Sequence, residues 1–209
     1  MKIIDISWPI SDATTEYKDQ KTIMFTQLKT FDKDGVRESS LCFNSHTGTH
    51  VDAPSHFLKD GKTIDEMHLD RLMGKAILLD LPTIGDSITE EDLHGYEMEE
   101  GDIVLLRTAN SAYEPTDPFA KDFISLDPSG AHYLAEKHIK AVGIDYLGIE
   151  RGDPEHRTHK TLMQADIAII EGLRLGHVQA GTYFLVCLPL AIIGLEAAPA
   201  RAILLTGAP

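Results

Sequence analysis

The sequence predicts a mixed α/β fold in one domain, residues 1–209, with an N-terminal β-hairpin attached to a mixed sheet. Three observations carry this prediction. The N-terminal third holds alternating runs typical of strands, the remainder holds short dense apolar runs, and helix-start signals separate several of these runs. With 25% charged and 43% hydrophobic residues, a chain of 209 residues buries about 70% of its unfolded surface and needs no disulfides.

The first elements along the chain are strands. Residues 3–6 form a short strand, and residues 22–31 and 36–44 flank an Asp-Lys-Asp-Gly turn, a pattern typical of a β-hairpin. Cys42 lies in an alternating run and Cys187 in an apolar run, so we expect both thiols to be buried. Two such cysteines form no secreted disulfide framework, which favours a reducing cytoplasm.

The middle and the end of the chain alternate strands with helices. Short apolar runs of the kind that both faces of a sheet cover occupy residues 75–81, 101–108 and 140–145. Thr89 and Asp92 resemble a capping box, and Asp127 before Pro128 indicates a second helix start. The last strands are expected at residues 166–170, 182–188 and 201–206.

Charge and hydropathy exclude several classes of partner. The chain has 33 Asp and Glu against 19 Lys and Arg, a net charge of −14 that repels phosphate backbones. The first residues hold no apolar core of the kind a signal peptide needs, and the apolar run 183–195 is too short to span a bilayer. We therefore expect a cytoplasmic protein that binds a small molecule and neither nucleic acid nor membrane.

The chemistry concentrates in residues 46–57, HTGTHVDAPSHF. As a straight strand this segment would hold His46 and His50 about 13 Å apart, too far for one ion, so we expect a bend at Gly48. His50 and Asp52 are two residues apart and share a face, and the following proline turns His56 toward the same pocket. Imidazoles with a carboxylate suit Zn²⁺, Mn²⁺ or Fe²⁺.

This segment resembles the His-x-Gly-Thr-His-x-Asp-x-Pro-x-His pattern of the metal-dependent cyclase family, which includes bacterial kynurenine formamidases and isatin hydrolases. The resemblance extends, in the family's order, to the segments GDIVLLRT, AVGID, EGLRL, GTYFL and PARAILL. It implies a swivelling β/β/α-like fold and two metals per chain, Mn²⁺ or Zn²⁺. It also implies an assembly of two or four copies that completes the substrate pocket.

The resemblance also implies the role of each residue. His46 and His50 would hold one metal, Asp52 would bridge, and His56 would be the acid and base. Glu171 would bridge as well.

The second metal would be completed by His159. The sequence alone supports Glu171, because a carboxylate on the same strand face as Ile167 and Ile169 needs a cationic partner. His159 rests on the resemblance, and His156 stays an alternative because it lies three residues earlier on the same helix.

The mechanism that follows is hydrolysis of a formamide or amide by a metal-activated water, with His56 moving the proton. Formamidases of this family carry a tryptophan against the aromatic substrate, whereas this chain reads TTEYKDQ there, so Tyr17 takes that place. Three alternatives stay open: hydrolysis of a cyclic amide or lactone, a lyase or cyclase on the same site, and a binding protein with one structural metal. We expect Trp8 to anchor the first strand, and Arg107 and Arg201 to form structural ion pairs. The remaining histidines are expected at the surface: His68, His94, His132, His138 and His177.

Overall fold

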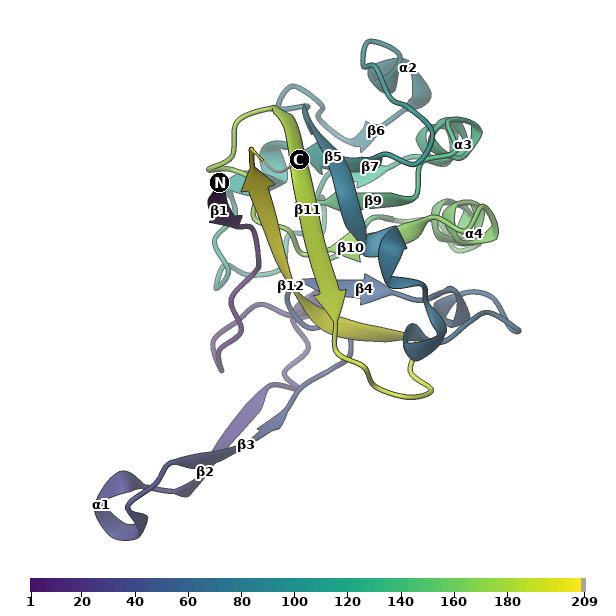
Figure 1. Ribbon diagram of the computed structural model, residues 1–209. Helices are drawn as coiled ribbons and strands as arrows, with labels where there is room; N and C mark the ends of the chain where they lie inside the picture. The colour runs from purple at the N-terminus through teal and green to yellow at the C-terminus, as the bar shows by residue number, and fades with distance from the viewer. Residues whose placement is uncertain (208–209) are drawn as a thin grey trace.

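The computed structural model describes residues 1–207 and has a mixed α/β architecture (Figure 1). Its strands are β1 (Lys2–Asp5), β2 (Met24–Lys29), β3 (Glu38–Cys42), β4 (His50–Asp52), β5 (Met73–Asp80), β6 (Ser87–Ile88), β7 (Ile103–Arg107), β8 (Ser125–Leu126), β9 (Ala141–Ile144), β10 (Ala168–Glu171), β11 (Gly181–Pro189) and β12 (Ala197–Thr206). Its helices are α1 (Phe31–Asp34), α2 (Glu90–Leu93), α3 (Pro128–Glu136) and α4 (Arg157–Gln164).

The main sheet closes on itself. Its strand order is β1-β12-β11-β5-β7-β9-β10-β4, and β4 also pairs with the first part of β12. Strands β12 to β4 therefore form a closed ring, and β1 pairs with β12 from outside it. Within the ring β5, β7, β9 and β10 run parallel, whereas the pairs made by β11, β12 and β4 are antiparallel. Closure leaves the short strand β4 held by hydrogen bonds on both of its edges.

Successive residues of the parallel strands point to two different cores. On β7, Ile103 and Leu105 belong to a core shared by the strands of the ring, whereas Val104 and Leu106 pack with residues of α2, α3 and α4. Strand β9 is buried at every position, as the dense apolar run at residues 140–145 predicted, and so is β10. In Figure 1 helices α2, α3 and α4 lie along one side of the sheet, whereas α1 lies at the tip of the β2–β3 hairpin. Apolar side chains fill the inside of the ring, so the outer face, on which α4 packs, is the one left to carry polar groups.

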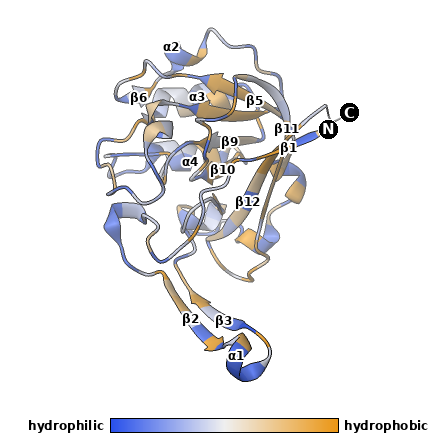
Figure 2. Cartoon of the chain, turned by 90° about the vertical axis from the view of Figure 1, so that its left-hand side faces the viewer, coloured by the Kyte–Doolittle hydropathy of each residue, from blue (hydrophilic) through white to orange (hydrophobic). Residues whose placement is uncertain are grey.

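Strands β2 and β3 pair antiparallel and project from the body of the protein (Figures 1 and 2). A single helical turn joins them and ends at Gly35, whose φ of +69° suits glycine. Every residue of both strands is exposed, so the expectation that Cys42 is buried is wrong. The alternation in the sequence is that of a two-stranded ribbon with no layer packed against either face. Cys187 is buried, as expected.

The helix-start signals of the sequence are confirmed. Thr89 and Asp92 form a reciprocal capping box on α2, and the Asp127 side chain accepts a hydrogen bond from the Ser129 backbone N–H at the start of α3. Strand β12 begins at Ala197, earlier than expected, because its first residues pair with β4. None of the described helices has the length and apolar character needed to cross a membrane.

Candidate metal centre

The histidine-rich segment bends at Gly48, as the sequence predicts. Gly48 has a φ of +63°, and a side chain there would press against Ile10 and the carbonyl of Trp8. The bend brings the rings of His46 and His50 to 5.0 Å between centroids. Two histidines that a straight strand would separate therefore meet at one place.

Strand pairing brings the acidic residues to the same place. Glu171 on β10 lies directly opposite His50 on β4, so the two side chains share a face of the sheet, and Asp52 lies on that face two residues further along. All three are buried. The burial of Glu171 agrees with the expectation that its carboxylate needs a cationic partner.

Helix α4 carries His159, and His156 is the residue immediately before the helix begins. The His159 side chain is 9% exposed and its Nε2 atom lies 3.5 Å from Glu171 Oε1 and 3.7 Å from Asp52 Oδ2. The His156 side chain is 47% exposed, and its ring packs at 4.6 Å from that of Phe57. Of the two alternatives that the sequence left open, only His159 faces Asp52 and Glu171, whereas His156 Nδ1 lies 3.9 Å from Glu150 Oε2.

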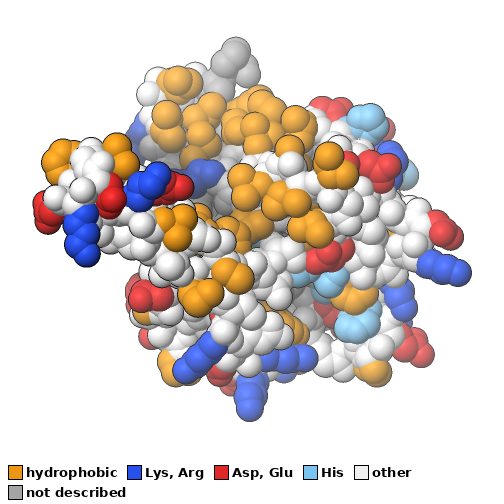
Figure 3. Space-filling view, turned by 90° about the horizontal axis from the view of Figure 1, so that it is seen from below, with side chains coloured by type: hydrophobic (Ala, Val, Ile, Leu, Met, Phe, Trp, Pro, Cys, Tyr) orange, Lys and Arg blue, Asp and Glu red, His pale blue; other side chains and the backbone are white. Residues whose placement is uncertain are grey.

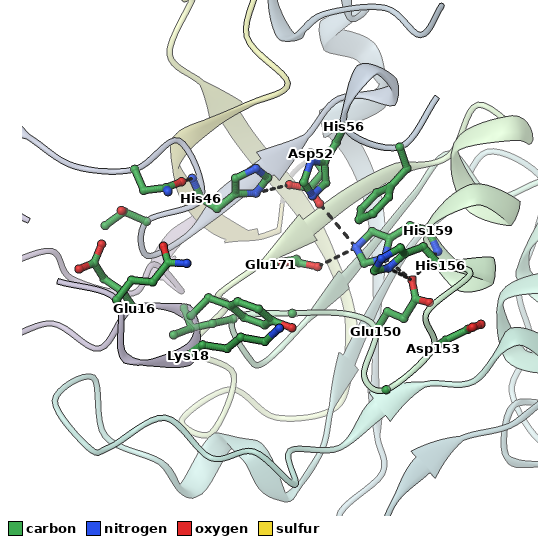
Figure 4. A pocket seen from close by; sticks show the side chains of 18 of the residues that line it. Glu16, Lys18, His46, Asp52, His56, Glu150, Asp153, His156, His159 and Glu171 are labelled. Atoms are coloured by element: carbon green, nitrogen blue, oxygen red, sulfur yellow. Dashed lines mark hydrogen bonds and ion pairs between the residues drawn. The ribbon is translucent and has the colours of Figure 1, made fainter. Parts of the chain in front are cut away.

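Each buried carboxylate divides its two oxygens between opposite sides of the cluster (Figure 4). Asp52 Oδ1 lies 3.0 Å from His46 Nδ1 and 3.5 Å from His50 Nε2, whereas its Oδ2 faces His159. Glu171 Oε2 lies 3.2 Å from His50 Nε2, whereas its Oε1 faces His159. This is the arrangement in which two carboxylates can bridge a pair of cations.

The unsatisfied atoms fit a metal. Both carboxylate oxygens of Asp52 are buried without a hydrogen-bond partner, a costly state unless a cation is present. His50 Nε2 is buried too, and carboxylate oxygens of Glu171 and Asp52 face it at 3.2 Å and 3.5 Å. The carbonyl of Gly48 lies 2.9 Å from His50 Nδ1; donation of the Nδ1 proton to it leaves the Nε2 lone pair free to bind a metal. The donor set of imidazoles and carboxylates suits Mn²⁺ and Zn²⁺.

The electrostatics of the cluster favour positive charge. Burial by itself would lower the pKa of His50, but the hydrogen bond to Glu171 and the charges of Asp52 and Glu171 raise it to about 9. For His159, burial again opposes the change, and Glu150 and Glu171 raise its pKa to about 10. Burial opposes ionisation of Glu171, yet hydrogen bonds with His159 and His50 bring its pKa well below the ordinary value. The carboxylates thus create a negative potential that a proton or a metal cation neutralises.

A cavity of about 600 Å³ opens beside the cluster. His56 lies on its wall at the end of a short turn, Pro54–His56, with its ring 4.3 Å from that of His46 and 6.1 Å from that of His159. Burial lowers the pKa of His56, which favours the neutral imidazole able to accept a proton. Tyr17 lines the same cavity and packs edge-on against Phe119 at 5.0 Å.

Sequence reasoning missed Glu150. Its side chain is 4% exposed, and its Oε2 atom accepts hydrogen bonds from both the Nδ1 and the backbone N–H of His159. The backbone N–H of Ile149 donates to Glu171 Oε1 at 2.6 Å. Two consecutive residues after β9 thus orient two of the candidate ligands. The sequence showed only that Glu150 is an acidic residue that follows a predicted buried strand. That position does not indicate that His159 is its hydrogen-bond partner.

The remaining residues that the sequence singled out lie away from the cluster. Arg107 pairs with Asp80 at 2.5 Å and Arg201 pairs with Asp5, as expected of structural ion pairs. Trp8 is 3% exposed and packs against Tyr146 beyond the end of β1. The other histidines are exposed, as predicted: His68, His94, His132, His138 and His177.

Comparison with known proteins points to one family. The model of the family described as "Putative cyclase" matches residues 4–151. A kynurenine formamidase of Salinibacter ruber is 33% identical over 207 residues, which cover 98% of this chain and 97% of that protein. A solved structure described as a "predicted metal-dependent hydrolase" from Bacillus stearothermophilus superposes with a TM-score of 0.87 at 42% identity, covering 97% of each chain. An isatin hydrolase bound to the product analogue thioisatinate has a TM-score of 0.88 at 21% identity, covering 98% of this chain and 92% of the other, and shows the common fold.

Proposed function

The chain belongs to the putative cyclase family, and from this premise we propose that it is a metal-dependent hydrolase that cleaves the C–N bond of a formamide or amide, as a kynurenine formamidase does. The observation that carries the proposal is the division of the Asp52 and Glu171 oxygens between His46 and His50 on one side and His159 on the other. That division suits two cations that share both carboxylates.

The residues of the cluster fit two divalent cations, Mn²⁺ or Zn²⁺. In this proposal His46 and His50 would hold one cation, His159 would hold the other, and the carboxylates of Asp52 and Glu171 would be available to both. When bound, such cations activate water as a nucleophile and polarise the carbonyl of the substrate.

His56 is the general acid and base in this proposal. Its imidazole lies on the cavity wall beside the cluster and not within the hydrogen bonds that connect the carboxylates. Because burial lowers its pKa, the ring is neutral near pH 7 and can take a proton from water and return it to the leaving nitrogen. Hydrolysis of a formamide then releases formate and an amine.

Tyr17 is the proposed contact for an aromatic substrate. It lines the cavity together with Phe57, so a planar ring can enter between aromatic side chains. The segment around Tyr17 contains no tryptophan and no Pro-Gly pair, which keeps a second candidate function open, the hydrolysis of a cyclic amide or lactone. A bicyclic substrate of that kind also fits a cavity of about 600 Å³.

The experiment that tests the proposal measures hydrolysis of N-formylkynurenine by protein loaded separately with Mn²⁺ and with Zn²⁺, beside His56→Ala. We expect His56→Ala to lose about 10²–10⁴-fold in kcat and to retain its metals. Loss of metal from this variant would contradict the role given to His56. If the wild type leaves N-formylkynurenine intact but opens cyclic amides or lactones, the second candidate is correct. A change in ultraviolet absorbance of a hydroxylated substrate without hydrolysis would indicate a lyase.

We propose in addition that the chain forms a homodimer or homotetramer through the β2–β3 hairpin. The hairpin carries large exposed hydrophobic side chains: Met24, Phe25, Leu28, Phe31, Val36 and Leu41. Figure 3 looks from below in Figure 1, where the loop between β11 and β12 lies, and hydrophobic side chains gather on that face too. Light scattering tests the proposal, and a particle of 23.1 kDa would contradict it.

A further inference from the structure

One wall of the cavity is formed by a segment in a rare backbone conformation. Glu16, Tyr17, Lys18 and Gln20 line the cavity, and two successive residues, Lys18 and Asp19, have φ values of +56° and +55°. Residues other than glycine seldom adopt this left-handed conformation, and they keep it only where the surroundings hold them.

The segment is held by a hydrogen bond between the residues that flank it and by contacts with the distant Phe119. The buried Glu16 carboxylate accepts a hydrogen bond from the Thr22 backbone N–H at 2.6 Å, and Asp19 Oδ1 accepts one from the Phe119 backbone N–H at 2.9 Å. The Tyr17 ring packs edge-on against the ring of Phe119. These contacts fix the segment on either side of Lys18 and present its side chain at the cavity.

Lys18 is the one Lys or Arg among the described residues that line the cavity. Its Nζ lies 5.1 Å from the centroid of the Tyr17 ring, and it forms no salt bridge within residues 1–207. The nearby acids are engaged elsewhere, since Glu150 binds His159 and Asp153 binds Arg157 at 2.7 Å. In Figure 4, Lys18 lies across the cavity from His46 and His56.

We propose that Lys18 determines specificity by binding an anionic group, a carboxylate, on an aromatic substrate whose ring contacts Tyr17. This inference rests on the proposed function, because it places the reacting carbonyl of the substrate at the metal cluster. Lys18 then binds the opposite end of the same substrate. An ammonium over an aromatic ring offers a charge and a flat apolar surface together, which matches a carboxylate attached to a planar ring.

A pair of substrates that differ by one carboxylate tests the inference. 2-Formamidobenzoate and formanilide release formate from the same type of bond, and only the first is anionic. The variants are Lys18→Met, which keeps length and removes charge, and Lys18→Arg, which keeps charge. Lys21→Met is the matched control, since Lys21 is an exposed lysine of the same segment that does not line the cavity.

We expect Lys18→Met to lower kcat/KM for 2-formamidobenzoate about tenfold, mainly through KM, because a charge-assisted contact at a partly exposed site is lost. Hydrolysis of formanilide should stay within about twofold, and Lys18→Arg should retain most of the activity toward the anion. Equal effects of Lys18→Met on both substrates, or an effect on neither, would overturn the inference.

A binding measurement separates failure of this inference from failure of the proposed function. If the metal-loaded wild type hydrolyses neither of these substrates nor N-formylkynurenine, the proposed formamidase function is wrong. Fluorescence titration with 2-aminobenzoate then still decides the role of Lys18. A Kd about tenfold weaker in Lys18→Met than in wild type and Lys21→Met supports it. An unchanged Kd, or no binding to the wild type, overturns it.

Discussion

Replacement of Glu150 by alanine should weaken one metal and spare the other. Glu150 accepts the Nδ1 proton of His159, so the Nε2 lone pair of that ring faces Glu171 and Asp52. Without this acceptor the ring can rotate and can carry its proton on either nitrogen. Loss of such an outer hydrogen bond lowers metal affinity about 10–100-fold, which corresponds to about 1.4–2.7 kcal/mol.

Calorimetric titration of metal-free protein with Mn²⁺, and separately with Zn²⁺, measures the effect. The wild type should bind two ions, and Glu150→Ala should bind one with normal affinity, at His46 and His50, and one with the reduced affinity. Glu150→Gln should lie closer to the wild type, because its amide oxygen can still accept the Nδ1 proton.

The control must separate metal binding from support of helix α4, since Glu150 also accepts the backbone N–H of His159 at 3.2 Å. Asp153→Ala removes a carboxylate at the same end of α4, where Asp153 accepts hydrogen bonds from Arg157, and leaves His159 untouched. It should lower thermal stability without changing either metal affinity. Normal binding of both ions by Glu150→Ala, or an equal loss in Asp153→Ala, would refute the reasoning.

Two further predictions concern stability. Gly172→Ala should destabilise the fold by about 2–4 kcal/mol in urea, because Gly172 has a φ of +69° and a methyl group there would collide with the carbonyl of Gly48. Burial raises the pKa of Asp145 from 3.8 to about 6, although Ser111 and Thr108 donate hydrogen bonds to it. Between about pH 4 and pH 6 the folded protein therefore keeps a proton that the unfolded chain has released, and the free energy of unfolding falls by up to about 3 kcal/mol as pH rises. Asp145→Asn should remove this dependence of the free energy of unfolding on pH. Urea unfolding in the presence of a metal chelator measures it.

For each of these two stability predictions, one experimental outcome would contradict it. Gly85→Ala is the control for Gly172→Ala, because a methyl group at Gly85 would meet no atom within 4 Å. Similar stability of the two alanine variants would show that the approach of Gly172 to Gly48 is not constrained. For Asp145, a wild-type stability that changes in parallel with that of Asp145→Asn between pH 4 and pH 6 would show that the carboxyl is ionised in the folded protein as well as in the unfolded chain.

The sequence was informative wherever the contacts are local. The bend at Gly48 and the shared face of His50 and Asp52 follow from the properties of neighbouring residues, and both are present in the structure. The capping of α2 and α3 follows in the same way. Glu171 required more, because its place opposite His50 depends on the pairing of strands far apart in the chain.

The features that the sequence did not predict depend on contacts between distant segments. Glu150 and Lys18 belong to different loops, and nothing near either residue indicates that both line one cavity with His159. The exposure of Cys42 is a failure of another kind, since an alternating pattern predicts one buried face and the hairpin has no layer to bury it. The hydrophobic periodicity of a strand shows which of its faces could be buried, and the topology of the fold decides whether another layer covers that face.

The double pairing of β4 has a consequence for biosynthesis. The segment that carries His46, His50, Asp52 and His56 leaves the ribosome long before β10 and β12, the two strands that hold β4 in place. The nascent chain therefore displays three imidazoles and a carboxylate without the geometry that distinguishes one metal from another. Contacts this distant in sequence also form slowly. We therefore expect selective metal binding to follow closure of the sheet. The metal that the protein carries in a cell should then reflect the metal ions available after the chain has left the ribosome.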